Sequence, residues 1–221
     1  MSNQDSFINE VTEEVRRERL YKLFRRYGWI PLVAVVVIVG GAAINEFFKA
    51  RAQAEAEAAG DALLAAFEAD DAATRADALA GIDPGDNAGR VALIALSQAT
   101  ALVEAGDVDD AIAVLETLAV NPGTPAVYQE LATLKAAMLG AGRTDPEARI
   151  QRLNGLVVGG SAFSLMALEQ IALAEIEMGR TDAAIETLRG ILVDASVTED
   201  LRRRATQLIV SLGAPQAALA Q

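Results

Sequence analysis

Residues 29–44 read WIPLVAVVVIVGGAAI, and no other part of the chain is as continuously apolar. These sixteen residues contain no charge, although Asp, Glu, Lys and Arg make up 23% of the 221 residues. An α-helix of this length rises about 24 Å, slightly less than the roughly 30 Å of a bilayer's hydrocarbon core. Tyr27, Phe47 and Phe48 extend the stretch with side chains that suit the membrane interface. We therefore predict one transmembrane helix over residues 28–46, anchored by Trp29, Pro31, Val35, Val39 and Ile44.

Two alternatives for this stretch remain open at the level of sequence. A buried core helix is the first, because apolar runs often lie inside soluble proteins, but the flanking aromatic and basic residues favour a span. A cleaved signal peptide is the second, because the small residues of 40–43 resemble a cleavage site. A long segment with five acidic residues precedes the apolar run, however, which is unlike a short basic n-region. We therefore favour an uncleaved signal anchor.

Charge is distributed unevenly on the two sides of the predicted span. Residues 1–28 carry six basic and five acidic residues, whereas residues 45–221 carry 13 basic and 26 acidic residues, a net charge of −13. The positive-inside rule then places the N-terminus in the cytoplasm and the large domain on the other side of the membrane. The basic residues that set this topology are Arg16, Arg17, Arg19, Lys22, Arg25 and Arg26.

The cytoplasmic tail, residues 1–27, is predicted to contain a basic amphipathic helix that begins near Glu10. Acidic residues come early and basic residues late in this helix, as the helix dipole prefers. It either contacts the anionic inner surface of the membrane or is a solvated lead-in to the span. The acidic domain beyond the span is a poor candidate for nucleic acid or anionic lipid. We expect membrane lipid and other proteins as partners, and no nucleic acid.

The composition predicts an all-α protein without enzymatic chemistry. Alanine, which costs least in a helix, dominates the 52% of hydrophobic residues. Cysteine and histidine are absent, which removes thiol chemistry, the commonest general base and the commonest metal ligand. Acidic pairs occur where helices are expected to start, so helix capping explains them: Asp70/Asp71, Asp109/Asp110 and Glu199/Asp200. We expect no enzyme activity, no cofactor, no metal and no small-molecule substrate.

A repeat appears in the chain beyond residues 47–87, which we predict to be a helical connector with an N-terminal repeat-like unit. The turn glycines Gly106, Gly142 and Gly179 are spaced 36 and 37 residues apart, and Ala111, Ala148 and Ala184 follow them at spacings of 37 and 36. A stretch of helical pattern precedes each glycine. Each unit is therefore a helical hairpin that must stack on its neighbours to bury its apolar face. We predict that residues 88–221 form such a repeat domain.

This pattern resembles the tetratricopeptide repeat, in which a glycine-containing turn joins two helices. In that family a small residue follows the glycine by five positions, and a large apolar residue follows four positions later. The first unit supplies Gly106, Ala111 and Leu115, and the last supplies Gly179, Ala184 and Leu188. The middle unit is degenerate near Pro146, and the period exceeds the usual ~34 residues. With the predicted span, the resemblance gives an all-α chain in which one N-terminal transmembrane helix precedes a tetratricopeptide-like helical-hairpin solenoid.

The last predicted helix, residues 198–212, carries three consecutive arginines at 202–204. The terminal repeat of a solenoid needs a polar outer face, because no further repeat covers it. We therefore expect these arginines to belong to such a cap, and a site for an anionic partner is the alternative.

The order of the parts resembles the bacterial ancillary SecYEG translocon subunit family. The resemblance covers most of residues 10–221, and EEVRRERLYKLFRRYG at 13–28 followed by the apolar run is its most specific piece. In that family the protein sits in the inner membrane beside the Sec translocon and is implicated in handing exported chains to periplasmic chaperones. The resemblance therefore implies a single-pass protein of the bacterial inner membrane with a periplasmic domain.

Two functions follow from these expectations. The first is a membrane-tethered protein–protein interaction module that serves the Sec translocon or the periplasmic chaperone network. The alternative is a structural or accessory subunit that packs on another inner-membrane complex, such as a respiratory assembly, through the span itself. A sensor is less favoured, because the 28 residues before the span leave little room for an output domain.

Overall fold

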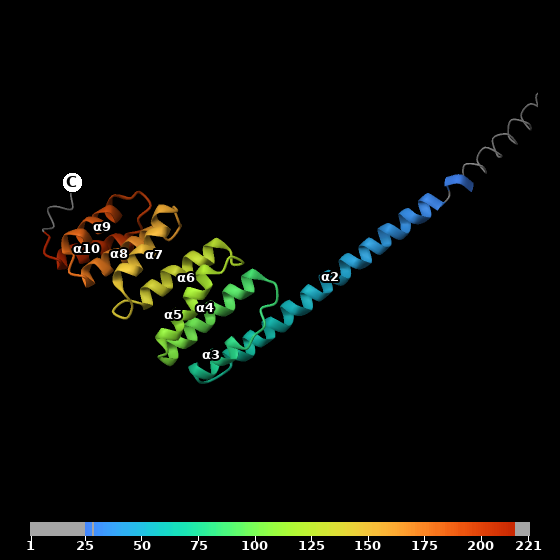
Figure 1. The fold of residues 1–221 in the computed structure, drawn as a ribbon, viewed down its shortest axis with the longest axis horizontal. Helices are drawn as coiled ribbons and strands as arrows, with labels where there is room; N and C mark the ends of the chain where they lie inside the picture. The colour runs from blue at the N-terminus through green and yellow to red at the C-terminus, as the bar shows by residue number, and fades with distance from the viewer. Residues whose placement is uncertain (1–24, 28, 215–221) are drawn as a thin grey trace, which may run out of the picture. The chain divides into compact units, whose positions relative to one another are not determined.

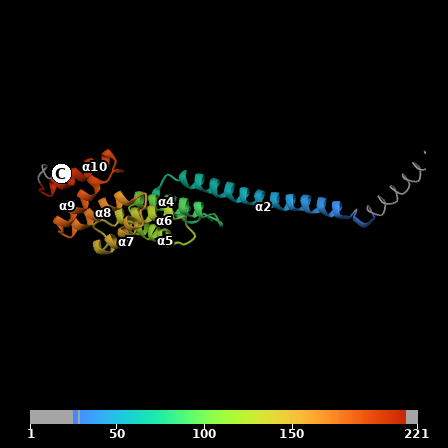
Figure 2. The same cartoon turned by 90° about the horizontal axis from the view of Figure 1, so that it is seen from above.

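The computed structural model describes residues 25–27 and 29–214, and all regular structure in this part of the chain is α-helical (Figure 1). The absence of β-strands from the described residues confirms the predicted all-α class. The helices are α2 (Trp29–Phe67), α3 (Ala72–Ala80), α4 (Ala88–Ala105), α5 (Val108–Val120), α6 (Ala126–Leu139), α7 (Pro146–Val158), α8 (Ser164–Glu177), α9 (Thr181–Val193) and α10 (Glu199–Ser211). Figure 2 shows the succession from α4 to α10 from a second direction.

The apolar stretch and the start of the connector form one helix. Helix α2 runs without a break for 39 residues, and its second half is rich in alanine, the best helix former. Two side-chain pairs span one turn there: Arg51 donates to Glu55 at 3.0 Å, and Gln53 donates to Glu57 at 2.9 Å. The chain divides into two compact units within this helix, between Glu57 and Ala58.

The second of these units has a core of four hydrophobic clusters that follow the order of the chain. The first cluster joins the end of α2 to α3 and α4, and the second joins α4, α5 and α6. The third joins α6, α7 and α8, and the fourth joins α8, α9 and α10. Helices α4, α6 and α8 each contribute to two clusters. The core is therefore continuous from the end of α2 to α10.

One leucine is fully buried in each cluster: Leu79, Leu115, Leu153 and Leu188. They lie in α3, α5, α7 and α9 and follow one another after 36, 38 and 35 residues. Leu115 and Leu188 lie where the sequence predicted packing residues. Leu79 and Leu153 were not among the predicted packing residues, although the regular spacing of the four leucines is a signal that identifies them.

Left-handed glycines end α4 and α8, with φ of 92° at Gly106 and 71° at Gly179. After α8 the N–H of Arg180 donates to the carbonyl of Glu175 at 2.8 Å, and the N–H of Gly179 donates to that of Ile176 at 2.9 Å. This pair of bonds is a Schellman motif, which satisfies carbonyls that the end of a helix leaves free. Gly142 is also left-handed, with φ of 69°, but it lies inside the longer connection 140–145 and does not cap α6.

Replacement of Gly179 by alanine is expected to lower the free energy of unfolding by about 1–2 kcal/mol, because an L side chain is strained in left-handed backbone. No neighbouring atom lies within 4 Å of the added Cβ, so backbone strain alone causes the loss. Gly190 lies inside α9 with equally open surroundings, and Gly190→Ala is expected to raise the free energy of unfolding by about 0.5–1 kcal/mol. Urea unfolding followed by far-UV circular dichroism measures the stability of both variants. Changes of the same sign in the two variants would contradict the left-handed conformation of Gly179.

Candidate membrane anchor and interaction surfaces

The apolar segment of α2, which we define as Trp29–Phe48, exposes its large side chains. Trp29 is 61% exposed, Ile38 70% and Phe47 66%. The candidate span in this helix has a mean hydropathy of 1.7, and none of it is buried. This N-terminal helix is therefore apolar enough to span a membrane, and its exposure argues against the buried-core alternative. Of the predicted anchor residues, Trp29, Val35, Val39 and Ile44 are exposed, and Pro31 lies in the first turn of α2.

Helix α4 is also long and apolar enough to cross a membrane, with a mean hydropathy of 1.2. Several of its apolar side chains, however, belong to the core of residues 58–214. Ala92 and Ala99 are buried in the cluster shared with α5 and α6, and Ala101 is buried in the cluster shared with α2 and α3. Packing between helices therefore accounts for the apolar character of α4.

The residues predicted to set topology are described only in part. Arg16, Arg17, Arg19 and Lys22 lie outside the described residues. Arg25 and Arg26 lie in the helical turn 25–27 and are exposed. The guanidinium of Arg26 lies 5.9 Å from the centre of the Tyr27 ring, which is a cation–π distance. The orientation of the chain in a membrane stays a prediction from charge.

The residue four positions before each buried leucine is either a small alanine or an arginine. Ala111 and Ala184 are fully buried and let α5 and α9 pack closely on the helices before them. In α7 this position belongs to Arg149, which is only 4% exposed. Ala148, which the sequence predicted there, is half-buried. The long connection before α7 moves the packing position one residue further from the turn glycine. The large side chain of Arg149 therefore lies where the hairpins α4–α5 and α8–α9 have an alanine.

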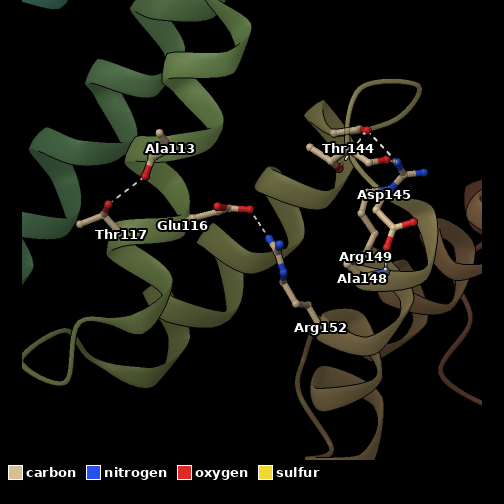
Figure 3. Close-up of polar contacts among 9 residues, drawn as sticks. Ala113, Glu116, Thr117, Thr144, Asp145, Ala148, Arg149 and Arg152 are labelled. Atoms are coloured by element: carbon tan, nitrogen blue, oxygen red, sulfur yellow. Dashed lines mark hydrogen bonds and ion pairs between the residues drawn. The ribbon is translucent and has the colours of Figure 1, made fainter.

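Arg149 joins the end of α6 to α7 and α8. One terminal nitrogen, Nη1, donates to the carbonyl of Gly140 at 2.7 Å and to that of Thr144 at 2.8 Å (Figure 3). The other terminal nitrogen, Nη2, pairs with the carboxylate of Glu177 at the end of α8. The arginine thereby donates to two carbonyls of the connection between α6 and α7, and the carbonyl of Gly140 also accepts from the N–H groups of Arg143 and Thr144.

Arg75 takes the same place in α3, 74 residues before Arg149. It donates to the carbonyl of Ala69, in the connection before its helix, at 3.2 Å. It also donates to Glu104, near the end of the following helix, at 2.5 Å. Two kinds of hairpin therefore alternate along the second compact unit. In the closely packed kind the second helix, α5 or α9, carries an alanine at this position, and in the open kind the second helix, α3 or α7, carries an arginine.

A cleft of about 300 Å³ opens between α5, α6 and α7, where α6 and α7 contact each other only sparsely. Its lining includes Val120 of α5, Ala137 of α6 and Arg149 of α7. An ion pair between Glu116 and Arg152 joins α5 to α7 beside the cleft (Figure 3). The bulk of Arg149, in place of an alanine, accounts for this separation of α6 from α7.

Further ion pairs connect neighbouring hairpins at separations close to one repeat. Asp109 pairs with Arg143 at 3.3 Å, and Glu147 pairs with Arg180 at 2.8 Å. These residues are 34 and 33 positions apart in the chain. Side chains at the starts of α5 and α7 therefore contact residues just before the starts of α7 and α9.

The arginine triplet of α10 is bonded within the protein. Arg204 donates to both carboxylate oxygens of the buried Glu169, at 2.7 and 2.8 Å, and these bonds raise the pKa of Arg204 above its ordinary value. Arg203 pairs with Asp200 at 2.6 Å, and Arg202 donates to the carbonyl of Leu192 at 3.0 Å. These contacts fit the predicted polar cap better than a site for an anionic partner.

A row of exposed apolar side chains recurs on the first helix of each hairpin. This apolar row consists of Phe67, Val103, Met138 and Leu173, at spacings of 36, 35 and 35 residues and with exposed fractions of 53%, 36%, 51% and 37%. Val103 and Met138 line a groove of about 210 Å³ between α4 and α6. Lys135 also lines this groove, and it pairs with no acidic group of the described residues. The groove therefore offers apolar surface and one free cation.

The acidic pairs lie at helix starts. Asp71 accepts a hydrogen bond from the N–H of Thr74 at 2.9 Å, and this bond lowers the pKa of Asp71 because it favours the charged carboxylate. The other pairs, Asp109/Asp110 and Glu199/Asp200, lie in the first turns of α5 and α10. Among the described residues, no acidic group is arranged to hold a metal ion. These carboxylates therefore serve the ends of helices, where the dipole favours negative charge.

No protein-family model, curated protein or solved structure matches the chain. The assignment of a function therefore depends on the apolar segment, the apolar row and the charges described above.

Proposed function

We propose that this chain is a membrane-tethered protein–protein interaction module. The apolar row carries the proposal, because four exposed apolar side chains recur at 35 or 36 residues along the stacked helices. Val103 and Met138 of this row line one groove, and a contiguous exposed apolar surface marks a binding site. Stacked hairpins provide the extended surface that such recognition uses. The exposed apolar segment of α2 supplies the tether.

We further propose that the hairpins are tetratricopeptide-like. The left-handed Gly106 and Gly179, and the buried Ala111 and Ala184 that follow each by five positions, support this assignment. The open hairpins depart from that pattern, since Arg149 replaces the small residue of α7. At α7 this departure coincides with the cleft between α5, α6 and α7 and does not break the continuous core.

The proposed location is the bacterial inner membrane, with the N-terminus in the cytoplasm and residues 47–221 in the periplasm. Support comes from the uneven charge on the two sides of the span and from the family resemblance of residues 13–28. The proposed partners are the Sec translocon or periplasmic chaperones. The groove with Lys135 fits a polypeptide that presents an apolar side chain next to a carboxylate.

A photo-crosslinking amino acid at Met138, in the full chain in bacterial cells, is expected to capture the translocon or a periplasmic chaperone. Met138 is 51% exposed in the apolar row, so the probe reaches a bound partner without disturbing the core. The matched control is the same probe at Glu186, an exposed site of α9 outside the row. Equal capture at both sites, or capture at neither, would contradict the proposal.

Exchange of residues 29–44 for an unrelated apolar span of equal length separates this function from its alternative. A structural subunit of another inner-membrane complex would make its contacts through the span. The exchange is then expected to abolish association with that complex. An interaction module tolerates the exchange, because its binding surface lies in the stacked helices.

A further inference from the structure

A row of valines lies at one edge of helices α3 to α10. The connections after α3, α5, α7 and α9 lie at this edge, opposite those after α4, α6 and α8, and the one after α3 carries Asp83 and Asp86 (Figure 1). Helices α5, α7 and α9 each end in a valine that is almost wholly exposed: Val120 at 78%, Val158 at 89% and Val193 at 83%. Val127 and Met166, near the starts of α6 and α8, are 49% and 40% exposed. We name these five residues the valine edge.

The valine edge is poor in charge. Residues 117–129 and residues 153–168 contain no Asp, Glu, Lys or Arg. Near Val193 the only charge before the next helix is Asp194, and α10 then begins with two acids. The charge-free part of the edge is therefore formed by the connections after α5 and α7 and by the helix ends that flank them.

The opposite edge is rich in charge. Residues 106–110, 143–147 and 177–182 each contain three charged residues. Since residues 45–221 as a whole carry a net charge of −13, most of their surface is repelled by anionic headgroups. The charge-free stretches of the valine edge can approach a bilayer without this repulsion.

We propose that the valine edge rests on the lipid bilayer in which the chain is anchored. This inference depends on the proposed membrane anchor. Tethering converts the contact into an intramolecular event at high effective concentration, so weak apolar contact is sufficient. Apolar side chains gain free energy when they leave water. The centres of protein interfaces favour Tyr, Trp and Arg, whereas four of the five residues here are valines, which are under-represented among binding hot spots and suit a fluid apolar phase better than a shaped partner.

The test uses single thiols, because the chain contains no cysteine. The full-length Val158→Cys chain is labelled with an environment-sensitive fluorophore and reconstituted through α2 into phosphatidylcholine vesicles. Half of the vesicles contain lipid with a nitroxide near the headgroup. The nitroxide is expected to quench the label at position 158. It is expected to leave unchanged a label at position 141 of the Ala141→Cys chain, which is exposed in the connection after α6.

A second pair of variants tests the valines themselves. With the label at position 162, in the exposed part of the connection after α7, Val120→Asp/Val158→Asp is expected to lose the quenching. The matched Val120→Leu/Val158→Leu chain is expected to keep it, because the edge remains apolar. Equal quenching of the two double variants would overturn the inference.

Flotation of the vesicles tests the anchor separately. A chain that does not float overturns the proposed anchor, and the valine edge with it. A chain that floats but is quenched equally at positions 158 and 141, or at neither, overturns the valine edge alone. A label at position 158 that is shielded from an aqueous quencher yet not reached by the nitroxide shows that protein covers this edge, which also overturns the inference.

Discussion

Replacement of Arg149 by alanine is expected to lower the free energy of unfolding by about 3 kcal/mol. The side chain is only 5% exposed and its partner Glu177 is 32% exposed. Removal of one member of a buried ion pair costs about 3–5 kcal/mol, and the partial exposure of Glu177 places this case at the lower end. The carbonyl of Thr144 also loses the arginine donor, whereas the carbonyl of Gly140 keeps the N–H groups of Arg143 and Thr144.

Arg152→Ala is the matched control, because it removes an arginine from the same helix and breaks an ion pair with Glu116. That pair is exposed, at 49% and 41%, and exposed pairs contribute about 0.2–1 kcal/mol. Urea unfolding of the full chain in mild detergent, followed by far-UV circular dichroism, measures both variants. Tryptophan fluorescence is unsuitable, since the single tryptophan, Trp29, lies in the apolar segment. Equal losses from the two variants would show that Arg149 is not a buried link between helices.

The hairpins α4–α5 and α8–α9 were predictable from the sequence because the chemistry of their turns is local. A glycine that ends a helix in left-handed backbone needs only its own neighbours, and Gly106 and Gly179 each do so within a few residues. The alanine and leucine that follow each glycine then lie at fixed helical positions. The sequence pattern therefore identifies four buried packing residues: Ala111, Leu115, Ala184 and Leu188.

The middle hairpin was not predictable in the same way. The hydrogen-bond partners of Arg149 lie 5, 9 and 28 residues away in the chain. No local sequence pattern therefore predicts that Arg149 links α7 to the end of α6 and to α8. The alignment on Gly142 therefore assigned the packing position to Ala148, one residue too early. The buried Leu153, four residues after Arg149, corrects the register, because it matches the other fully buried leucines.

The exposed surfaces also lay beyond the reach of periodicity. Apolar residues at helical spacing predict a buried face, and they do not show where that face ends. Val157 and Val158 are adjacent residues of the same type, yet Val157 packs against the third cluster and Val158 is 89% exposed. Only the positions of neighbouring helices decide between them. Both the apolar row and the valine edge are results of tertiary packing for this reason.

Two arginines at the centre of the apolar segment, Val36→Arg/Val37→Arg, are expected to abolish stable membrane association. Each arginine at the middle of a transmembrane helix costs about 2.5–3.5 kcal/mol, so the pair costs about 5–7 kcal/mol. The two positions lie seven residues, or about 11 Å, from either end of the sixteen-residue run, which is too far for an arginine stem to reach the interface easily. Both valines are exposed, at 63% and 65%, so the substitutions remove no core packing.

Vesicle flotation and alkaline extraction of membranes measure this loss. The matched control is Val36→Leu/Val37→Leu, which keeps the segment apolar and is expected to float like the unaltered chain. Far-UV circular dichroism of both variants in detergent is expected to show intact helices, because the clusters that hold α3 to α10 lie outside this segment. A double-arginine chain that still floats fully would show that α2 does not cross the bilayer. The exposed valines and isoleucines of this helix would then need a protein partner to cover them.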